Sequence, residues 1–277
     1  MFDTFFLVIL FVVILGYKWE GRILAQVLLS ILLGFVSNYI VFKNWVYFEI
    51  NKDYIFKLLS YGVPLIFYSI FYLIMFYFNR FIMAKFLSLD DVGIFSVGVQ
   101  LGAFIDLLAS SFNTAFFPWI YKNLSIIDNL LNNNEIKKAF TIKQRIVKII
   151  YLYIFGLLFI SILFYFIFVF LMKYILGSSF VKVIDFLFII IMAFYFKSLY
   201  YIFSYFIVYT QRTIILTLVT GITAIFSIFL NYYFIKYFGL WGAVYSFFIT
   251  FFIYFILTFI FSIKIYELPW FIFKSRK

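Results

Sequence analysis

Two charged residues stand near the middle of long apolar runs. Asp106 lies halfway along residues 93–119, and Lys197 lies halfway along residues 183–209. Each run is long enough to cross a bilayer, because about 20 helical residues span the ~30 Å of hydrocarbon. A charge at that depth costs roughly 2.5–3.5 kcal/mol on insertion scales and normally faces a bundle interior or a wet cavity. The pattern therefore predicts a membrane protein with a polar path inside it.

The residue types that are missing exclude most catalytic chemistry. The chain contains no cysteine and no histidine, which removes thiolate nucleophiles, His-based metal sites and Ser-His-Asp catalysis. The nucleotide-binding patterns G-x-x-x-x-G-K-[ST] and G-x-G-x-x-G do not occur either. We therefore expect no enzyme, no metal and no cofactor. Any transport would be secondary, driven by a substrate gradient or by a coupling ion such as a proton or sodium.

Composition and segment length predict an all-α integral membrane protein. The 277 residues are 67% hydrophobic and 12% charged, whereas a soluble domain is usually nearer half apolar and a quarter charged. The apolar residues gather in eight segments of about membrane length, each a predicted transmembrane helix. These segments are residues 2–17, 22–42, 58–83, 93–119, 146–172, 183–209, 213–235 and 241–263.

Basic residues are shared unevenly between the two sides of the membrane. If Met1 is placed in the cytoplasm and the sides alternate, the cytoplasmic segments carry fourteen Lys and Arg residues and the other side carries six. Because basic loops are retained in the cytoplasm, we expect both termini there. The net charge of +11 then reflects topology, and we expect no nucleic-acid partner because the basic residues do not gather on one soluble face.

Residues 120–145 form the longest polar and basic connection. Two interpretations are open for it. Ser125 to Gln144 form an amphipathic helix on the membrane surface, or the whole connection is a solvated loop.

One face of segment 93–119 is polar or small, and successive members of this stripe are three or four residues apart. Gly93, Gly98 and Gly102 add sites for close helix approach. The stripe lines a cavity, or it packs against another helix through a few hydrogen bonds; Asp106 favours the cavity. Its members are Ser96, Gln100, Ala103, Asp106, Ser110 and Asn113.

Segment 58–83 combines helix-breaking and polar residues. Gly62 and Pro64 are expected to break or kink its first turns, and Pro118 is expected to kink the end of segment 93–119. Arg80 follows near the predicted outer end, where it snorkels to the interface or contacts an anion at the mouth of the cavity. The polar positions at related spacing are Ser69, Tyr72 and Asn79.

Segment 183–209 places Lys197 on one face with three hydroxyl-bearing residues. Tyr200, Tyr201 and Ser204 follow it at the i+3, i+4 and i+7 positions. Lys197 either meets an anionic substrate or forms a purely structural ion pair with Asp106.

Four stretches carry a family resemblance. Residues 58–101 read LLSYGVPLIFYSIFYLIMFYFNRFIMAKFLSLDDVGIFSVGVQL, and this run resembles the start of the second half of polysaccharide-exporting flippases. These are Wzx-type members of the multidrug/oligosaccharidyl-lipid/polysaccharide (MOP) superfamily, which has a MATE-like fold. Three further stretches resemble motifs of the same family and follow its order along the chain. They are SFNTAFFPWIYKNL (Ser111–Leu124), GLWGAVYSFFITFF (Gly239–Phe252) and WEGRILAQVLLSILLG (Trp19–Gly34). The positions matched in the first run are Gly62, Pro64, Leu65, Arg80, Phe81, Val92, Gly93, Phe95 and Ser96.

The resemblance implies a function and a domain organisation. It implies a flippase in the bacterial inner membrane that moves undecaprenyl-pyrophosphate-linked oligosaccharides by alternating access through a cationic cavity. Its substrates would be O-antigen repeat units of lipopolysaccharide or capsule repeat units. The eight segments match the fifth to twelfth helices of such proteins, so the first four are absent. Residues 1–48 would then be two helices of an N-terminal bundle, and residues 49–277 a six-helix bundle. Two departures from the family pattern are Asn79, where an acidic residue often precedes the Arg, and Phe67, which replaces a proline.

Other classes remain open at this point. A membrane-embedded polysaccharide polymerase or glycosyltransferase would need a large external loop with catalytic residues, but the longest connection is predicted to be cytoplasmic. A MATE-type multidrug exporter shares the fold and is disfavoured by the Gly62–Leu65 pattern. An inactive fragment that only packs with a partner is the third alternative. The expected partners are lipid-linked oligosaccharide and membrane lipids.

Overall fold

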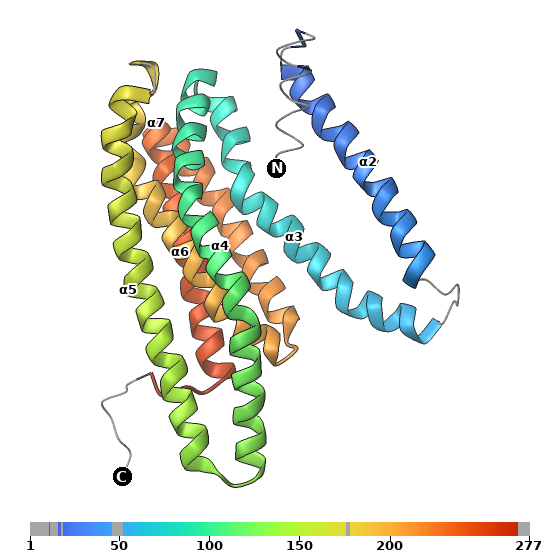
Figure 1. Cartoon of the computed structure of the whole chain (residues 1–277). Helices are drawn as coiled ribbons and strands as arrows, with labels where there is room; N and C mark the ends of the chain where they lie inside the picture. The colour runs from blue at the N-terminus through green and yellow to red at the C-terminus, as the bar shows by residue number, and fades with distance from the viewer. Residues whose placement is uncertain (1–10, 12–15, 18, 46–51, 176–177, 271–277) are drawn as a thin grey trace. The chain divides into compact units, whose positions relative to one another are not determined.

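The computed structural model describes residues 11, 16–17, 19–45, 52–175 and 178–270 (Figure 1). These residues are almost entirely helical and include no strand, so the predicted all-α membrane fold is confirmed. Six helical elements in the described part, with the C-terminal element counted as one, are long and apolar enough to cross a membrane. The elements are α2 (Trp19–Trp45), α3 (Lys52–Phe86), α4 (Leu89–Asn132), α5 (Ile136–Ile175), the 3-10 helix η2 (Ser178–Val183), α6 (Ile184–Tyr209) and α7 (Thr213–Ile265).

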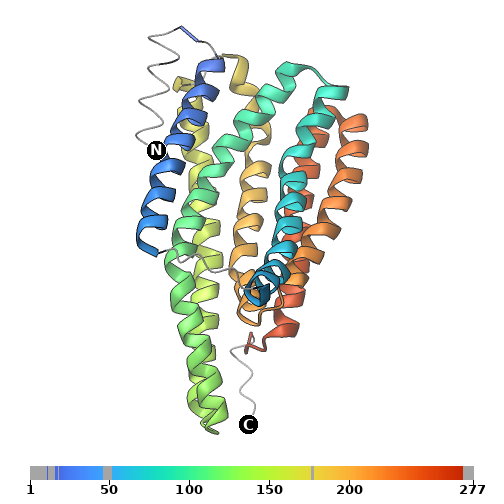
Figure 2. The same ribbon diagram turned by 90° about the vertical axis from the view of Figure 1, so that its right-hand side faces the viewer.

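The element α7 is two antiparallel helices joined by a tight turn. Gly239 interrupts the helix with φ 59° and ψ −133°, a left-handed φ that glycine adopts at little cost. Hydrogen bonds then join residues on either side of the turn: Ser246 Oγ donates to Asn231 Oδ1 at 2.7 Å. Figure 2 shows the two halves, orange and red, running side by side. The predicted segments 213–235 and 241–263 are therefore separate helices, as expected.

The chain divides into two compact units, Met1–Lys57 and Leu58–Lys277. The first contains α2, most of whose apolar side chains are exposed. The second contains most of α3 and all later helices. The predicted helix over residues 2–17 lies almost wholly outside the described residues. The domains 1–48 and 49–277 stay a prediction.

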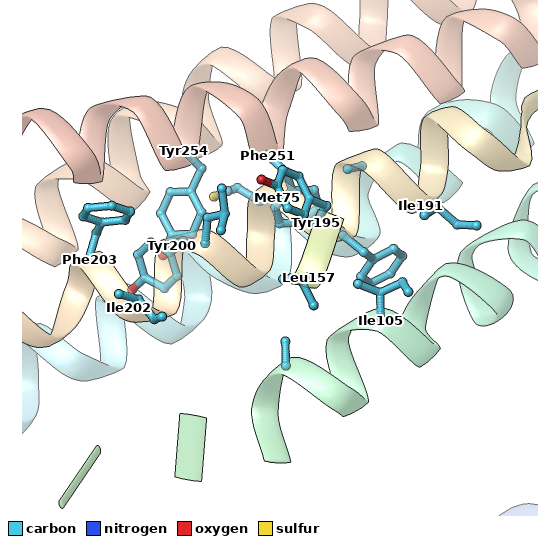
Figure 3. Close-up of a cluster of buried hydrophobic side chains, with 14 of the residues drawn as sticks. Met75, Ile105, Leu157, Ile191, Tyr195, Tyr200, Ile202, Phe203, Phe251 and Tyr254 are labelled. Atoms are coloured by element: carbon cyan, nitrogen blue, oxygen red, sulfur yellow. The ribbon is translucent and has the colours of Figure 1, made fainter. Parts of the chain in front are cut away.

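Helix α6 forms the centre of the second unit. It packs against α4, α5 and α7, and most of its side chains are buried. A helix that is apolar over most of its surface is typical of a buried position or a membrane span, and in α6 the neighbouring helices bury most of that surface. Figure 3 shows the aromatic core on its α7 side, where Tyr200 stacks on Tyr254 with ring centroids 4.1 Å apart.

Two glycines allow α4 to approach α6 closely. A Cβ added at Gly102 would lie 2.6 Å from Phe194 Cδ2, and one added at Gly98 would lie 2.9 Å from Ile190 Cδ1. A larger residue at either position would force the packed Ile190 and Phe194 side chains of α6 to shift. The expectation of close helix approach is confirmed at these two positions but not at Gly93, where an added Cβ would meet no atom within 4 Å.

The connection over residues 120–145 is neither a surface helix nor a loop, so both interpretations of it are wrong. α4 continues to Asn132 and α5 begins at Ile136, leaving a three-residue turn. α4 has 44 residues, about 66 Å of helix, so this hairpin extends beyond the other helices of its unit (Figures 1 and 2). A buried stripe holds the extension together: Ile120, Leu124, Ile127, Ala139 and Ile146 are all buried.

The predicted helix break at Gly62 and Pro64 is also wrong. α3 continues as an α-helix from Lys52 to Phe86, and α4 likewise continues through Pro118. A neighbouring helix contacts this part of α3, because Thr217 Oγ1 donates to the Pro64 carbonyl at 3.0 Å. A kink without a break at these three residues stays a prediction.

Candidate functional site

The two mid-span charges meet across the interface of α4 and α6. Lys197 Nζ donates to Asp106 Oδ2 at 2.8 Å. The pair is asymmetric, because the Lys197 side chain is 5% exposed and that of Asp106 is 24% exposed. The ammonium is therefore buried, while the carboxylate is partly exposed. Burial of a charge is tolerated when a partner compensates it, and this geometry gives Lys197 that partner.

Aromatic rings from α3 and α6 surround the rest of the Lys197 ammonium. Its Nζ lies 5.5 Å from the ring centroid of Tyr72, 5.1 Å from that of Phe76 and 5.4 Å from that of Phe194. Cation–π attraction at such distances contributes about 0.5–2 kcal/mol, most where water is excluded. The structure thus brings the predicted site residue Tyr72 to Lys197 through its ring.

Tyr201 completes the hydrogen bonding of the carboxylate. Its hydroxyl donates to Asp106 Oδ1 at 3.2 Å, so each oxygen of Asp106 has one donor from α6. The sequence placed Tyr201 on the Lys197 face by its i+4 spacing, but the spacing gave no sign of which group it would contact.

Arg80 borders the same ring as Lys197. Its Cζ lies 5.9 Å from the ring centroid of Phe76 and 5.1 Å from that of Tyr77, and its side chain is half-buried. In the described part of the chain no ion pair joins Arg80 to an acid. Two cations therefore border Phe76, one paired with a carboxylate and one not.

Asn79 and Gln100 do not join this cluster. Asn79 is 1% exposed, and neither its Nδ2 nor its Oδ1 has a hydrogen-bond partner among the described residues. Gln100 is exposed on α4, and within the described ranges no hydrogen bond links it to Asp106 or Lys197. Burial of an amide without hydrogen-bond partners costs free energy. The Asn79 side chain is therefore destabilising in the arrangement that the described residues form.

A groove of about 410 Å³ opens beside Tyr201 on the surface of α4 and α6. Helical spacing indicated Ser110, Asn113 and Tyr201 in this region but did not identify Phe117 or Tyr205. The signal was present in the i+4 step from Tyr201 to Tyr205. The groove is lined by Ser110, Asn113, Thr114, Phe117, Tyr201 and Tyr205.

Asn113 lies at the buried side of this groove. It is 4% exposed; its Nδ2 donates to Tyr153 Oη at 3.4 Å, and its backbone carbonyl accepts from Tyr205 Oη at 3.2 Å. Its Oδ1 has no hydrogen-bond partner among the described residues. Asn113, which lines the groove, therefore carries a buried acceptor without a donor among the described residues.

Helix α3 is attached to α6 by side-chain contacts near the ion pair. Tyr68 Oη and Tyr200 Oη form a hydrogen bond of 3.0 Å, and Phe76 packs edge-on against Phe194 with centroids 6.1 Å apart. Tyr200 in turn stacks on Tyr254 of α7 (Figure 3). These contacts place the α3 rings over Lys197 without close backbone packing.

Comparison with known proteins gives a partial match. Neither the curated proteins nor the solved structures include a match to this chain. Residues 4–124 match the family described as polysaccharide biosynthesis protein. The match includes Asp106 and Arg80 and ends before α6, which carries Lys197. Over residues 4–124, then, the chain is similar to polysaccharide biosynthesis proteins, which agrees with the resemblance read from its motifs.

Proposed function

We propose that this protein is a flippase of the inner membrane that moves oligosaccharides linked to undecaprenyl pyrophosphate by alternating access. The observation that carries the proposal is the ion pair of Lys197 and Asp106, which is buried on the lysine side and open on the carboxylate side. The family match over residues 4–124 supports a role in polysaccharide biosynthesis.

The ion pair acts as a site that exchanges one anion for another. In the empty state Asp106 neutralises Lys197. A pyrophosphate that enters from the open side competes for the ammonium, and the surrounding rings exclude water, which strengthens its electrostatic attraction. Arg80, which borders the same ring, supplies a second cation for the second phosphate.

Displacement of Asp106 provides a means of coupling. Once Lys197 binds phosphate, the carboxylate is left with Tyr201 alone and gains affinity for a cation. A proton or sodium ion can neutralise it there, because an uncompensated charge at membrane depth is costly. Release of the substrate restores the ion pair and expels the coupling ion.

Helix α3 is the element that moves between the two states. Its contacts to α6 and α7 include hydrogen bonds from hydroxyl groups, such as Tyr68 with Tyr200, and edge-on contacts between aromatic rings, such as Phe76 with Phe194. α4 and α6, by contrast, are held close through Gly98 and Gly102. Side-chain contacts of this kind can be exchanged during rigid-body helix motion at lower cost than a close-packed interface.

The test is a transport assay in proteoliposomes. Undecaprenyl-pyrophosphate-linked oligosaccharide is placed in both leaflets, and a membrane-impermeant glycosidase reports the glycans that reach the outside. The wild-type protein should expose the inner-leaflet pool with time. Lys197→Gln and Asp106→Asn should each lower the initial rate at least about tenfold, equivalent to about 1.4 kcal/mol in the barrier.

Two matched variants control for charge removal as such. Lys236→Gln and Asp185→Asn remove the same charges from exposed positions on α7 and α6, and both should transport at the wild-type rate. Normal transport by Lys197→Gln and Asp106→Asn at equal incorporation would show that the ion pair is structural and would refute the exchange mechanism.

A further inference from the structure

The groove beside the ion pair has the chemistry of a carbohydrate site. Phe117 and Tyr205 form an aromatic corner with ring centroids 5.1 Å apart, and the C–H face of a pyranose packs well against such rings. Ser110, Asn113 and Thr114 supply polar side chains to the same groove. A few placed polar groups on a mostly apolar wall are typical of small-molecule sites.

The hydrogen-bond acceptors of the groove favour a hydroxyl-rich ligand. Its Oδ1 is buried without a partner among the described residues, and a buried acceptor without a donor costs about 1–3 kcal/mol. The Ser110 and Thr114 hydroxyls donate to carbonyls of their own helix, at 2.9 Å each, so they present acceptors as well. A ligand rich in O–H or N–H donors would bond to the Ser110 and Thr114 oxygens directly, and it would satisfy the buried Asn113 Oδ1 once that amide turns toward the groove; an acyl chain would do neither.

The groove lies within reach of a sugar attached to a bound pyrophosphate. Ser110 is four residues after Asp106, about 6 Å along the helix axis, and Asn113 is seven residues after it, about 10 Å. Tyr201 belongs to both places, because its ring lines the groove and its hydroxyl donates to Asp106. The groove also lies toward the α4–α5 hairpin, which is the predicted cytoplasmic side.

We propose that this groove binds the first sugar of the lipid-linked substrate, and that Tyr201 links its occupancy to the ion pair. This inference rests on the proposed function and adds a subsite that distinguishes the glycosylated carrier from the bare lipid pyrophosphate. A sugar in the groove contacts the Tyr201 ring, so filling the groove favours the arrangement in which Asp106 releases Lys197.

The experiment compares two probes that differ by one sugar. Citronellyl pyrophosphate and citronellyl pyrophosphate carrying N-acetylglucosamine are titrated against the full chain in nanodiscs, with binding followed by tryptophan fluorescence. The wild-type protein should bind the glycosylated probe at least about tenfold more tightly. Asn113→Leu and Phe117→Leu should each remove most of that preference and leave the affinity for the bare pyrophosphate within about twofold.

Control variants separate the groove from the ion pair. Lys197→Gln should weaken both probes together, and Asn129→Leu and Phe155→Leu, at exposed positions on α4 and α5, should leave both affinities unchanged. Phe117 is 38% exposed, so its variant keeps the test valid even if Asn113→Leu does not fold.

Each outcome bears on one of the two proposals. Equal binding of both probes by the wild type, or a preference that survives Asn113→Leu and Phe117→Leu, overturns the sugar subsite and leaves the flippase proposal standing. Binding of neither probe overturns both. Tighter binding of the glycosylated probe that is lost only in Lys197→Gln would assign the sugar to the ion pair and overturn the groove.

Discussion

Lys197 and Asp106 are 91 residues apart in sequence, yet Nζ of one lies 2.8 Å from Oδ2 of the other. Their burial differs, with side-chain exposures of 5% and 24%. Removal of one partner therefore has unequal consequences. Loss of the carboxylate leaves a buried ammonium, whereas loss of the lysine leaves a partly exposed carboxylate with Tyr201.

This asymmetry predicts the order of stability among variants of the pair. Asp106→Leu should lower the free energy of unfolding by about 3–5 kcal/mol, and Lys197→Met should lower it by about 1–3 kcal/mol. The first effect is larger because breaking a buried pair costs most where the remaining charge is buried. The double variant should be more stable than Asp106→Leu alone. Thermal unfolding of the purified protein in detergent measures all three, and an additive double variant would contradict the prediction.

The α4–α6 interface should not tolerate a methyl group at Gly102. An added Cβ would lie 2.6 Å from Phe194 Cδ2 and 2.9 Å from Ile190 Cγ2, so Gly102→Ala should destabilise the protein by about 1–3 kcal/mol through overpacking. Gly156→Ala is the matched control. Nothing lies within 4 Å of a Cβ there, and replacing a helical glycine by alanine should gain up to about 1 kcal/mol. Melting temperatures that shift equally would refute the argument.

The turn within α7 should depend on Gly242. A Cβ at this position would lie 1.9 Å from the Phe234 carbonyl oxygen, which is backbone and cannot move aside. Gly242→Ala should therefore prevent the two halves of α7 from pairing and lower the yield of monodisperse protein in size-exclusion chromatography. Gly62→Ala, where no atom lies within 4 Å, should give normal yield. A normal profile for Gly242→Ala would mean that the turn has another geometry.

The charge distribution predicts opposite sides for the two ends of α4. Single cysteines at Lys138, in the α4–α5 hairpin, and at Lys85, at the end of α3, are introduced into a chain that has no native cysteine. An impermeant maleimide should label the Lys85 position in intact cells and the Lys138 position only after permeabilisation, because basic segments are retained inside. Labelling of both positions in intact cells would show that the topology is wrong.

The sequence predicted the spanning helices well because the signal is local. Membrane length, apolar composition and uneven basic loops are properties of single segments. Each predicted segment from residue 22 onward lies within an α-helix of the structure, except that Val183 belongs to η2. The same local reasoning failed at residues 120–145. Their polar residues indicated a loop or a surface helix, but a buried stripe that includes Leu124 and Ile146 joins two helices into a hairpin.

The charged pair could be anticipated only as two isolated residues at membrane depth. Helical spacing placed Tyr201 on the Lys197 face, and the cost of a charge in hydrocarbon required some compensation for Asp106 and Lys197. Gln100 was assigned to the same stripe by the same spacing, yet it is exposed and lies outside the cluster. Periodicity assigns a residue to a face without specifying how that face is rotated.

The sequence by itself thus determined that the chain is helical, that it spans a membrane, and that two of its helices carry a charge which needs a partner. Tertiary structure alone decided that these charges pair with each other, that Phe76 borders both Lys197 and Arg80, and that a groove opens between Asn113 and Tyr205. The reason is physical. Hydrophobic length and charge cost act on each segment separately, whereas contacts between helices depend on their register and rotation, which are set by how closely residues such as Gly98 and Gly102 allow them to pack.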